Sequence, residues 1–120
     1  MNRDKFDLIV TVVNKNTSES ILKASKEAGA EGGTIVYGRG TGIRETKTLF
    51  GIPIEPEKEI ILTIVPQDIT TQVQQAIIQA AGLDQPGAGI LFVLELKQVA
   101  GICHLCMEES EQSLQDTSEQ

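Results

Sequence analysis

Residues 59–82 read EIILTIVPQDITTQVQQAIIQAAG, a stretch in which a strand runs directly into a helix. Residues 59–65 predict a strand, because residues 60–65 are all β-branched or aliphatic, and Pro66 is expected to end it. The spacing then becomes helical, because apolar residues lie 4, 7, 8 and 11 positions after Ile69 and so share one face. Asp68 is expected to cap this helix, and Gly82 to end it.

The rest of the chain repeats the alternation of strand and helix. Residues 7–13 predict a first strand, and Asn16, with a glutamate three residues on, predicts a capping box for a helix over 17–28. Residues 34–37 and 90–96 predict the remaining strands. The order β-α-β-β-α-β predicts an α+β, ferredoxin-like fold, in which two helices cover one face of a four-stranded antiparallel sheet.

The predicted first, third and fourth strands are apolar on both faces rather than on alternate residues. Successive side chains of a strand point to opposite faces, so both faces of this sheet need cover. Two helices can cover only one of them. A partner subunit is the natural cover for the other, and the sequence therefore predicts an oligomer.

Composition and charge restrict the class of protein. The chain has 120 residues, 40% of them hydrophobic, which suits one domain, expected over residues 1–106. Its net charge of −7 is concentrated in an acidic tail over 107–120, expected to be disordered, and nothing resembles the basic face of a nucleic-acid-binding protein. No apolar run approaches the ~20 residues that span a bilayer, and the N-terminus has no signal-peptide pattern. A cytoplasmic protein that is not itself a membrane protein is expected.

Two glycine-containing turns are candidate ligand sites. Residues 38–42 read GRGTG and open a long loop over about 40–57, while Gly87-Ala88-Gly89 precedes the last strand. Each turn is either a phosphate-binding nest of backbone amides or a simple hinge or turn. Within the loop, Ile52 and Ile54 are expected to pack against the protein itself, and Phe50 either packs or contacts a partner.

Other chemistry-bearing residues give weaker signals. Cys103-His104-Leu105-Cys106 is a metal site, a reversible redox pair or a segment without function, since one chain offers three ligands where zinc takes four. The alternating acids Glu55, Glu57 and Glu59 either bind a cation or, as we prefer, form a solvated strand edge. No acid–base–nucleophile set is visible, so no enzymatic activity is expected.

Three segments together resemble the PII nitrogen-regulatory family. Residues 29–34, followed by Gly40-Thr41-Gly42, resemble the family's helix-one exit, its second strand and the glycine pair that opens its T-loop. Residues 58–66 resemble the strand after that loop, and residues 87–93 are similar to the family's B-loop and last core strand. The resemblance spans about residues 7–102.

The resemblance implies a homotrimer with an adenine nucleotide (AMP, ADP or ATP) in each cleft between subunits. It implies a regulator that controls a partner enzyme or membrane transporter through the flexible loop, in which Arg44, Lys47 and Phe50 are the candidate contacts. Carried over by position, the candidate ligand-binding residues are Thr34, Gly40, Thr41, Gly42, Lys58, Ile64, Gly87, Ala88 and Gly89.

The chain also departs from the family pattern. Ile90 stands where the family has a lysine for the phosphates, and Gly101 and Cys103 stand where it has two arginines. Fewer cations favour a less charged nucleotide than ATP, or an unrelated ligand, although Arg39, Arg44 and Lys47 offer replacement charges from the loop. The alternative function is a metal- or redox-responsive trimer that uses Cys103, His104 and Cys106.

Overall fold

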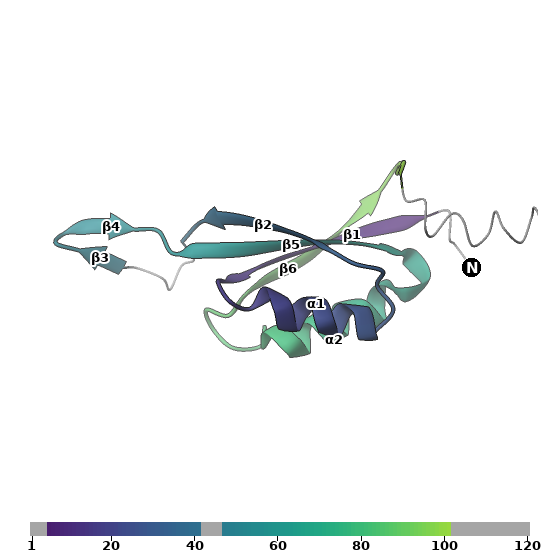
Figure 1. The fold of residues 1–120 in the computed structure, drawn as a ribbon, viewed down its shortest axis with the longest axis horizontal. Helices are drawn as coiled ribbons and strands as arrows, with labels where there is room; N and C mark the ends of the chain where they lie inside the picture. Colours follow the sequence, from purple (N-terminus) through teal and green to yellow (C-terminus); the bar gives the residue numbers. More distant parts are fainter. Residues whose placement is uncertain (1–4, 42–46, 102–120) are drawn as a thin grey trace, which may run out of the picture.

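The computed structural model describes residues 5–41 and 47–101, and it has the expected ferredoxin-like order of elements. A four-stranded antiparallel sheet has the strand order β2-β5-β1-β6, so the first and third strands of the motif lie in the centre. Helices α1 and α2 lie side by side on one face of this sheet, and the other face is open (Figure 1). The elements are β1 (Phe6–Asn14), α1 (Ser18–Glu27), β2 (Thr34–Arg39), β3 (Lys47–Leu49), β4 (Ile52–Ile54), β5 (Glu57–Pro66), a short 3₁₀ turn η1 (Gln67–Ile69), α2 (Thr70–Ala81) and β6 (Gly89–Leu96).

The core lies between the sheet and the two helices. Its fully buried side chains are aliphatic, as the low aromatic content requires: Ile9, Val13, Ile21, Ile61, Val65, Val73 and Ile77. The core residues of β1 and β5 have odd numbers, and alternate residues of a strand point to the same face. The odd-numbered residues of the two central strands therefore face the helices and form the core. Thr11 and Thr63 lie on the same face of their strands and are also fully buried, and neither hydroxyl has a hydrogen-bond partner among the described residues.

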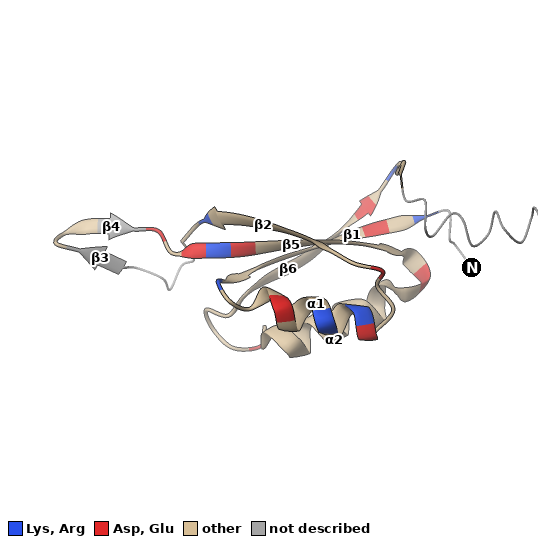
Figure 2. Cartoon of the chain, viewed as in Figure 1, with Lys and Arg blue, Asp and Glu red and all other residues tan. Residues whose placement is uncertain are grey.

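The other parity of the strands forms the open sheet face. Val10 lies on this face between Leu62 and Phe92, the residues that it pairs with on β5 and β6. Five aliphatic or aromatic side chains here stay substantially exposed in the single chain: Val36, Ile64, Ile90, Phe92 and Leu94. Charged residues lie on α1 and toward the ends of the strands, and the middle of the sheet carries none (Figure 2). One face of the sheet is therefore apolar, and no other part of the described residues, 5–41 and 47–101, covers it.

The long loop contains regular structure that the sequence did not predict. Strands β3 and β4 form a hairpin that extends beyond the end of the sheet, away from the helices (Figure 1). Leu49 pairs with Ile52, so Phe50 and Gly51 form a two-residue turn, and both have positive φ angles of 52° and 78°. Such turns connect strands in the twist that hairpins favour.

Neither helix in the described part of the chain has the length and apolar character that a membrane span requires.

Both predicted helix caps are wrong. Asn16 has a left-handed φ of 70°, Thr17 stands at the N-cap of α1, and no side chain at that position caps the helix. Asp68 lies within η1, and Ile69 occupies the N-cap position of α2 without a side-chain cap. Gly82 does end α2, with a left-handed φ of 63°.

Candidate functional site

Both glycine turns lie at the same end of the sheet. Gly89 begins β6 opposite Val13, near the end of β1, while Gly38 pairs with Lys58 at the start of β5. The hairpin leaves the sheet at this end, and the backbone N–H of Gly40 donates to the carbonyl of Pro56 over 3.2 Å across its base. This end therefore combines two turns with the root of an extended loop.

The two glycines of the second turn have different reasons to be glycine. A Cβ on Gly89 would lie 2.4 Å from the carbonyl oxygen of Val12, so Gly89 is required by the close approach of β6 to β1. Gly87 has a φ of 79°, but a Cβ there would meet no atom within 4 Å. Gly87 is thus open toward its surroundings, as a residue that approaches a ligand should be.

A chain of side-chain hydrogen bonds lies on the open sheet face at this end. The ammonium of Lys58, only 8% exposed, donates to Oδ1 of Asn14 over 2.7 Å. Nδ2 of Asn14 in turn donates to the carbonyl of Gly87 over 3.3 Å. Asn14 is the last residue of β1, and it joins the start of β5 to the Gly87 turn.

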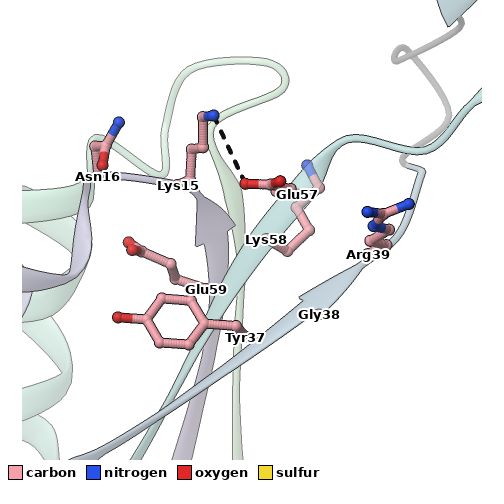
Figure 3. Close-up of a pocket in the computed structure, with 8 residues that line it drawn as sticks. All are labelled: Lys15, Asn16, Tyr37, Gly38, Arg39, Glu57, Lys58 and Glu59. Carbon is pink, nitrogen blue, oxygen red and sulfur yellow. Dashed lines mark ion pairs between the residues drawn. The ribbon is translucent and has the colours of Figure 1, made fainter.

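On the helix side of the same sheet end, a pocket of about 450 Å³ opens beside the start of α1 (Figure 3). Across it, Nζ of Lys15 lies 3.6 Å from a carboxylate oxygen of Glu57, in an exposed ion pair. Tyr37 and Arg39 reach it from β2. Arg39 has the parity of Ile35, which packs against the core, so its side chain is on the opposite face from Lys58. The pocket is lined by Lys15, Asn16, Tyr37, Gly38, Arg39, Glu57, Lys58 and Glu59.

Glu59 caps α1 from a distant strand. Its Oε1 accepts from the backbone N–H groups of Thr17, over 3.0 Å, and Ser18, over 2.9 Å. Burial alone would raise the pKa of the Glu59 carboxyl, but these backbone donors, with that of Asn16, lower it below the ordinary value of 4.5. Glu59 is 5% exposed, so the expectation that it forms part of a solvated edge is wrong.

The single chain brings together only some of the predicted ligand-binding residues. Gly40, Lys58, Gly87, Ala88 and Gly89 gather at one end of the sheet. Thr34 pairs with Leu62, and Ile64 lies six residues beyond Lys58 on β5. At ~3.3 Å per residue, Ile64 is about 20 Å from Lys58. Thr41 ends the first described segment, at the root of the loop.

The remaining predicted residues divide by whether the structure describes them. Gly42, Arg44, Cys103, His104 and Cys106 lie outside the described residues, as does the tail over 107–120, and only the backbone of Lys47 is described, in β3. Phe50 is 94% exposed at the hairpin tip. Ile52 is 65% exposed in the single chain, so its expected packing onto an assembly of this chain stays a prediction, and the side chain of Ile54 lies outside the described residues.

Sequence reasoning missed Asn14 and the pocket beside α1. Asn14 was interpreted only as part of the break after the first strand, because neither of its partners is local: Lys58 is 44 residues away and Gly87 is 73. The register of β1 against β5 was the signal that would have found the contact, since it places two polar residues opposite each other at the end of two apolar strands.

The fold and this arrangement define a ferredoxin-like domain with two glycine turns and a projecting hairpin at one sheet end. The sequence pattern of the family described as Nitrogen regulatory protein P-II matches residues 6–104. The chain therefore belongs to the P-II family, and it is a PII-type regulatory protein. Comparison with curated protein sequences gives no significant match.

Solved structures show the same fold. The crystal structure of Arabidopsis thaliana PII bound to citrate has a TM-score of 0.66 and 23% identity, over 82% of this chain and 84% of that chain. The B. subtilis GlnK–ATP complex has a TM-score of 0.65 and 18% identity, over 82% and 90% of the two chains. Another structure of B. subtilis GlnK has a TM-score of 0.60 and 19% identity, over 78% and 86%.

Proposed function

We propose that the protein is a cytoplasmic, non-enzymatic homotrimer that senses a small anionic effector between its subunits and signals to a protein partner through the hairpin. The observation that carries this proposal is the apolar open face of the sheet, which ends at the two glycine turns. Exposed apolar patches of this kind mark interaction surfaces. Burying one large apolar side chain of the face is worth roughly 1.5–3 kcal/mol, so several together favour assembly.

The separation of the candidate ligand residues supports a site shared between subunits. Ile64, about 20 Å from Lys58, is too far away to contact the same small molecule within one chain. In an assembly through the open faces, one subunit supplies the glycine turns and its neighbour supplies the other end of its sheet. The site is thus complete only in the oligomer.

The charges at the site favour an effector of modest negative charge, such as AMP or ADP. Lys58 supplies a cation on the open face, whereas Arg39 points to the helix face and does not replace the cation absent at Ile90. Backbone amides of the two turns supply neutral donors for phosphate or carboxylate oxygens. Among similar structures, one PII is bound to citrate and one GlnK is in complex with ATP, which supports an anionic ligand in general.

The hairpin is suited to contact a partner enzyme or membrane transporter. It projects beyond the sheet, so a partner can reach its tip without touching the body (Figure 1). Phe50 offers an exposed aromatic ring there, and aromatic residues are frequent anchors of protein interfaces. A ligand at the root of the hairpin is well placed to change its position, as in switches that order or release a loop.

The assembly is tested by measuring the mass of the protein in solution by light scattering. Three times the chain mass of 13.0 kDa is expected. Phe92→Glu should give a monomer, because it places a charge in the proposed interface. Val93→Glu is the matched control. Val93 is the next residue and is comparably exposed, but its side chain points to the face of the sheet that carries the helices. A monomeric native protein, or equal effects of both variants, contradicts the assembly.

The effector is tested by thermal-shift measurements with AMP, ADP, ATP, 2-oxoglutarate and citrate. A ligand at 100 times its Kd stabilises the folded state by ~2.7 kcal/mol, which raises Tm measurably. AMP or ADP is expected to raise Tm more than ATP at equal concentration, and Lys58→Met should remove most of that increase. The absence of any shift with these compounds contradicts the proposed effector class while leaving the trimer intact.

A further inference from the structure

Asn14 occupies a place where its two neighbours need a side chain that both accepts and donates a hydrogen bond, as a carboxamide does. Val13 belongs to the core, so Asn14, the next residue, faces the open side of the sheet, directly opposite Lys58. The Lys58 ammonium can only donate a hydrogen bond, and the Gly87 carbonyl can only accept one. The Asn14 amide turns Oδ1 to the first, over 2.7 Å, and Nδ2 to the second, over 3.3 Å.

The contacts of Asn14 continue to the base of the hairpin. Lys58 is the second residue of β5, and Pro56, two residues earlier, accepts from the backbone N–H of Gly40 over 3.2 Å. The carbonyl of Asn14 also accepts from the hydroxyl of Thr17 over 2.8 Å, which fixes the backbone at the end of β1. A continuous series of hydrogen bonds and short backbone steps thus runs from the Gly87 turn to the closing bond of the hairpin.

We propose that Asn14 is a positioning residue that couples the Gly87 turn to the hairpin base through Lys58. A change in the turn moves the Gly87 carbonyl, the amide follows it, and the Lys58 side chain transmits the movement to the first residues of β5. The ligand that causes this change in the cell rests on the proposed function, but the coupling is a property of the chain itself. It can therefore be measured without any ligand.

The test perturbs the turn and observes the hairpin base. In the full-length protein, Gly87→Ala strains a backbone with a φ of 79°, yet its new Cβ meets nothing within 4 Å. Amide hydrogen exchange at Gly40, followed by NMR, reports the bond to Pro56. The strain of a left-handed non-glycine residue is ~1 kcal/mol, which corresponds to about fivefold in an equilibrium constant, so exchange at Gly40 should accelerate by up to about fivefold. Gly82→Ala is the control, because Gly82 is also left-handed and unobstructed but lies at the end of α2.

The role of Asn14 is decided by repeating the Gly87→Ala experiment in two proteins that carry a substitution at Asn14. In Asn14→Ala, the Gly87→Ala change should leave exchange at Gly40 unaltered within about 1.5-fold, because the link is absent. Asn14→Asp keeps an acceptor for Lys58 but has no donor for Gly87, so it should abolish the response as well. A response that persists at full size in either background, or that is equally large with Gly82→Ala, overturns the coupling. So does the lack of any response to Gly87→Ala in the native background.

The same samples separate this inference from the proposed function. ADP is titrated into the native protein, and the exchange at Gly40 is measured again. If ADP fails to bind while the two-variant experiment shows coupling, the proposed effector is wrong and the role of Asn14 stands. If ADP binds and alters exchange at Gly40 equally with and without the Asn14 side chain, Asn14 does not carry the signal.

Discussion

Replacing Glu59 by glutamine should destabilise the protein in a pH-dependent way. The side chain is 5% exposed, and its carboxylate accepts from two backbone amides at the start of α1. Glutamine has nearly the same shape and keeps one acceptor oxygen, so the variant changes the charge and little else. The experiment therefore measures what the negative charge contributes at a helix N-terminus supplied by a remote strand.

The magnitude follows from two opposing effects. Hydrogen bonds to a charged acceptor are worth roughly 1.5–3 kcal/mol each and those to a neutral one roughly 0.5–1.5, so two bonds lose about 2 kcal/mol together. The interaction of the charge with the helix N-terminus adds ~0.3–1 kcal/mol. Burial disfavours the charged form and offsets part of this sum. We expect a net loss of about 1–2 kcal/mol near neutral pH.

The pH dependence has a definite sign. The pKa of Glu59 is lower in the folded state than the ordinary value of 4.5 that applies to the unfolded chain. The unfolded state thus binds more protons in this range, and the stabilisation is complete above the unfolded pKa and disappears as pH falls through the folded pKa. The difference in unfolding free energy between native and Glu59→Gln should shrink when pH is lowered from about 6 to about 3.

The assay is urea unfolding at several pH values and one fixed protein concentration, since the stability of an oligomer depends on concentration. Glu57→Gln is the matched control, two residues away on β5, because the interaction of Glu57 with the described part of the chain is an exposed ion pair with Lys15. It should change stability by less than about 1 kcal/mol. The reasoning is refuted if the two variants lose equal unfolding free energy. It is also refuted if the difference in unfolding free energy between the native protein and Glu59→Gln does not vary with pH.

Three further predictions test other parts of the structure. Thr11→Val and Thr63→Val should each stabilise the protein by ~1–2 kcal/mol in urea unfolding, because each removes a buried hydroxyl that has no partner among the described residues. Thr70→Val is the control and should destabilise the protein, since the Thr70 hydroxyl donates to Asp7 over 2.7 Å. Destabilisation by both core variants would mean that these hydroxyls are satisfied. Gly89→Ala should lower Tm far more than Gly87→Ala, because only the former places a Cβ 2.4 Å from a carbonyl oxygen; similar Tm values would contradict that packing. Phe50→Ser should leave Tm within a degree or two while weakening binding to a partner, since the ring is 94% exposed, and an unchanged affinity would exclude the hairpin tip as the anchor.

The sheet and helices could be predicted because each is specified by a local pattern. The residues of β5 and α2 follow one another with a change of period from strand to helix, and the structure has both elements within two residues of the expected bounds. The apolar character of both sheet faces was also visible in the sequence. Val10 and Phe92 turn out to be neighbours on the open face, while Ile9 and Val93 turn toward the helices.

What could not be predicted depends on contacts between distant residues. The predicted capping box at Asn16 is wrong because Asn16 adopts a left-handed conformation. Glu59, about 40 residues away, instead accepts hydrogen bonds from the backbone N–H groups at the start of α1. Local propensity cannot reveal such a contact, because it exists only once β5 lies beside β1 and α1. The hairpin was missed for a related reason, since strands of three residues are too short to show a period.

Two adjacent residues at the start of β5 show why this point of the fold can transmit a signal. Lys58 and Glu59 point to opposite faces of the sheet, as neighbours in a strand must. Lys58 is bound through Asn14 to the Gly87 turn on the open face, while Glu59 is bound to the first amides of α1 on the helix face. The hairpin leaves the sheet immediately before them. A displacement of its root is therefore expected to disturb contacts on both faces, which is what the proposed signalling through the hairpin requires.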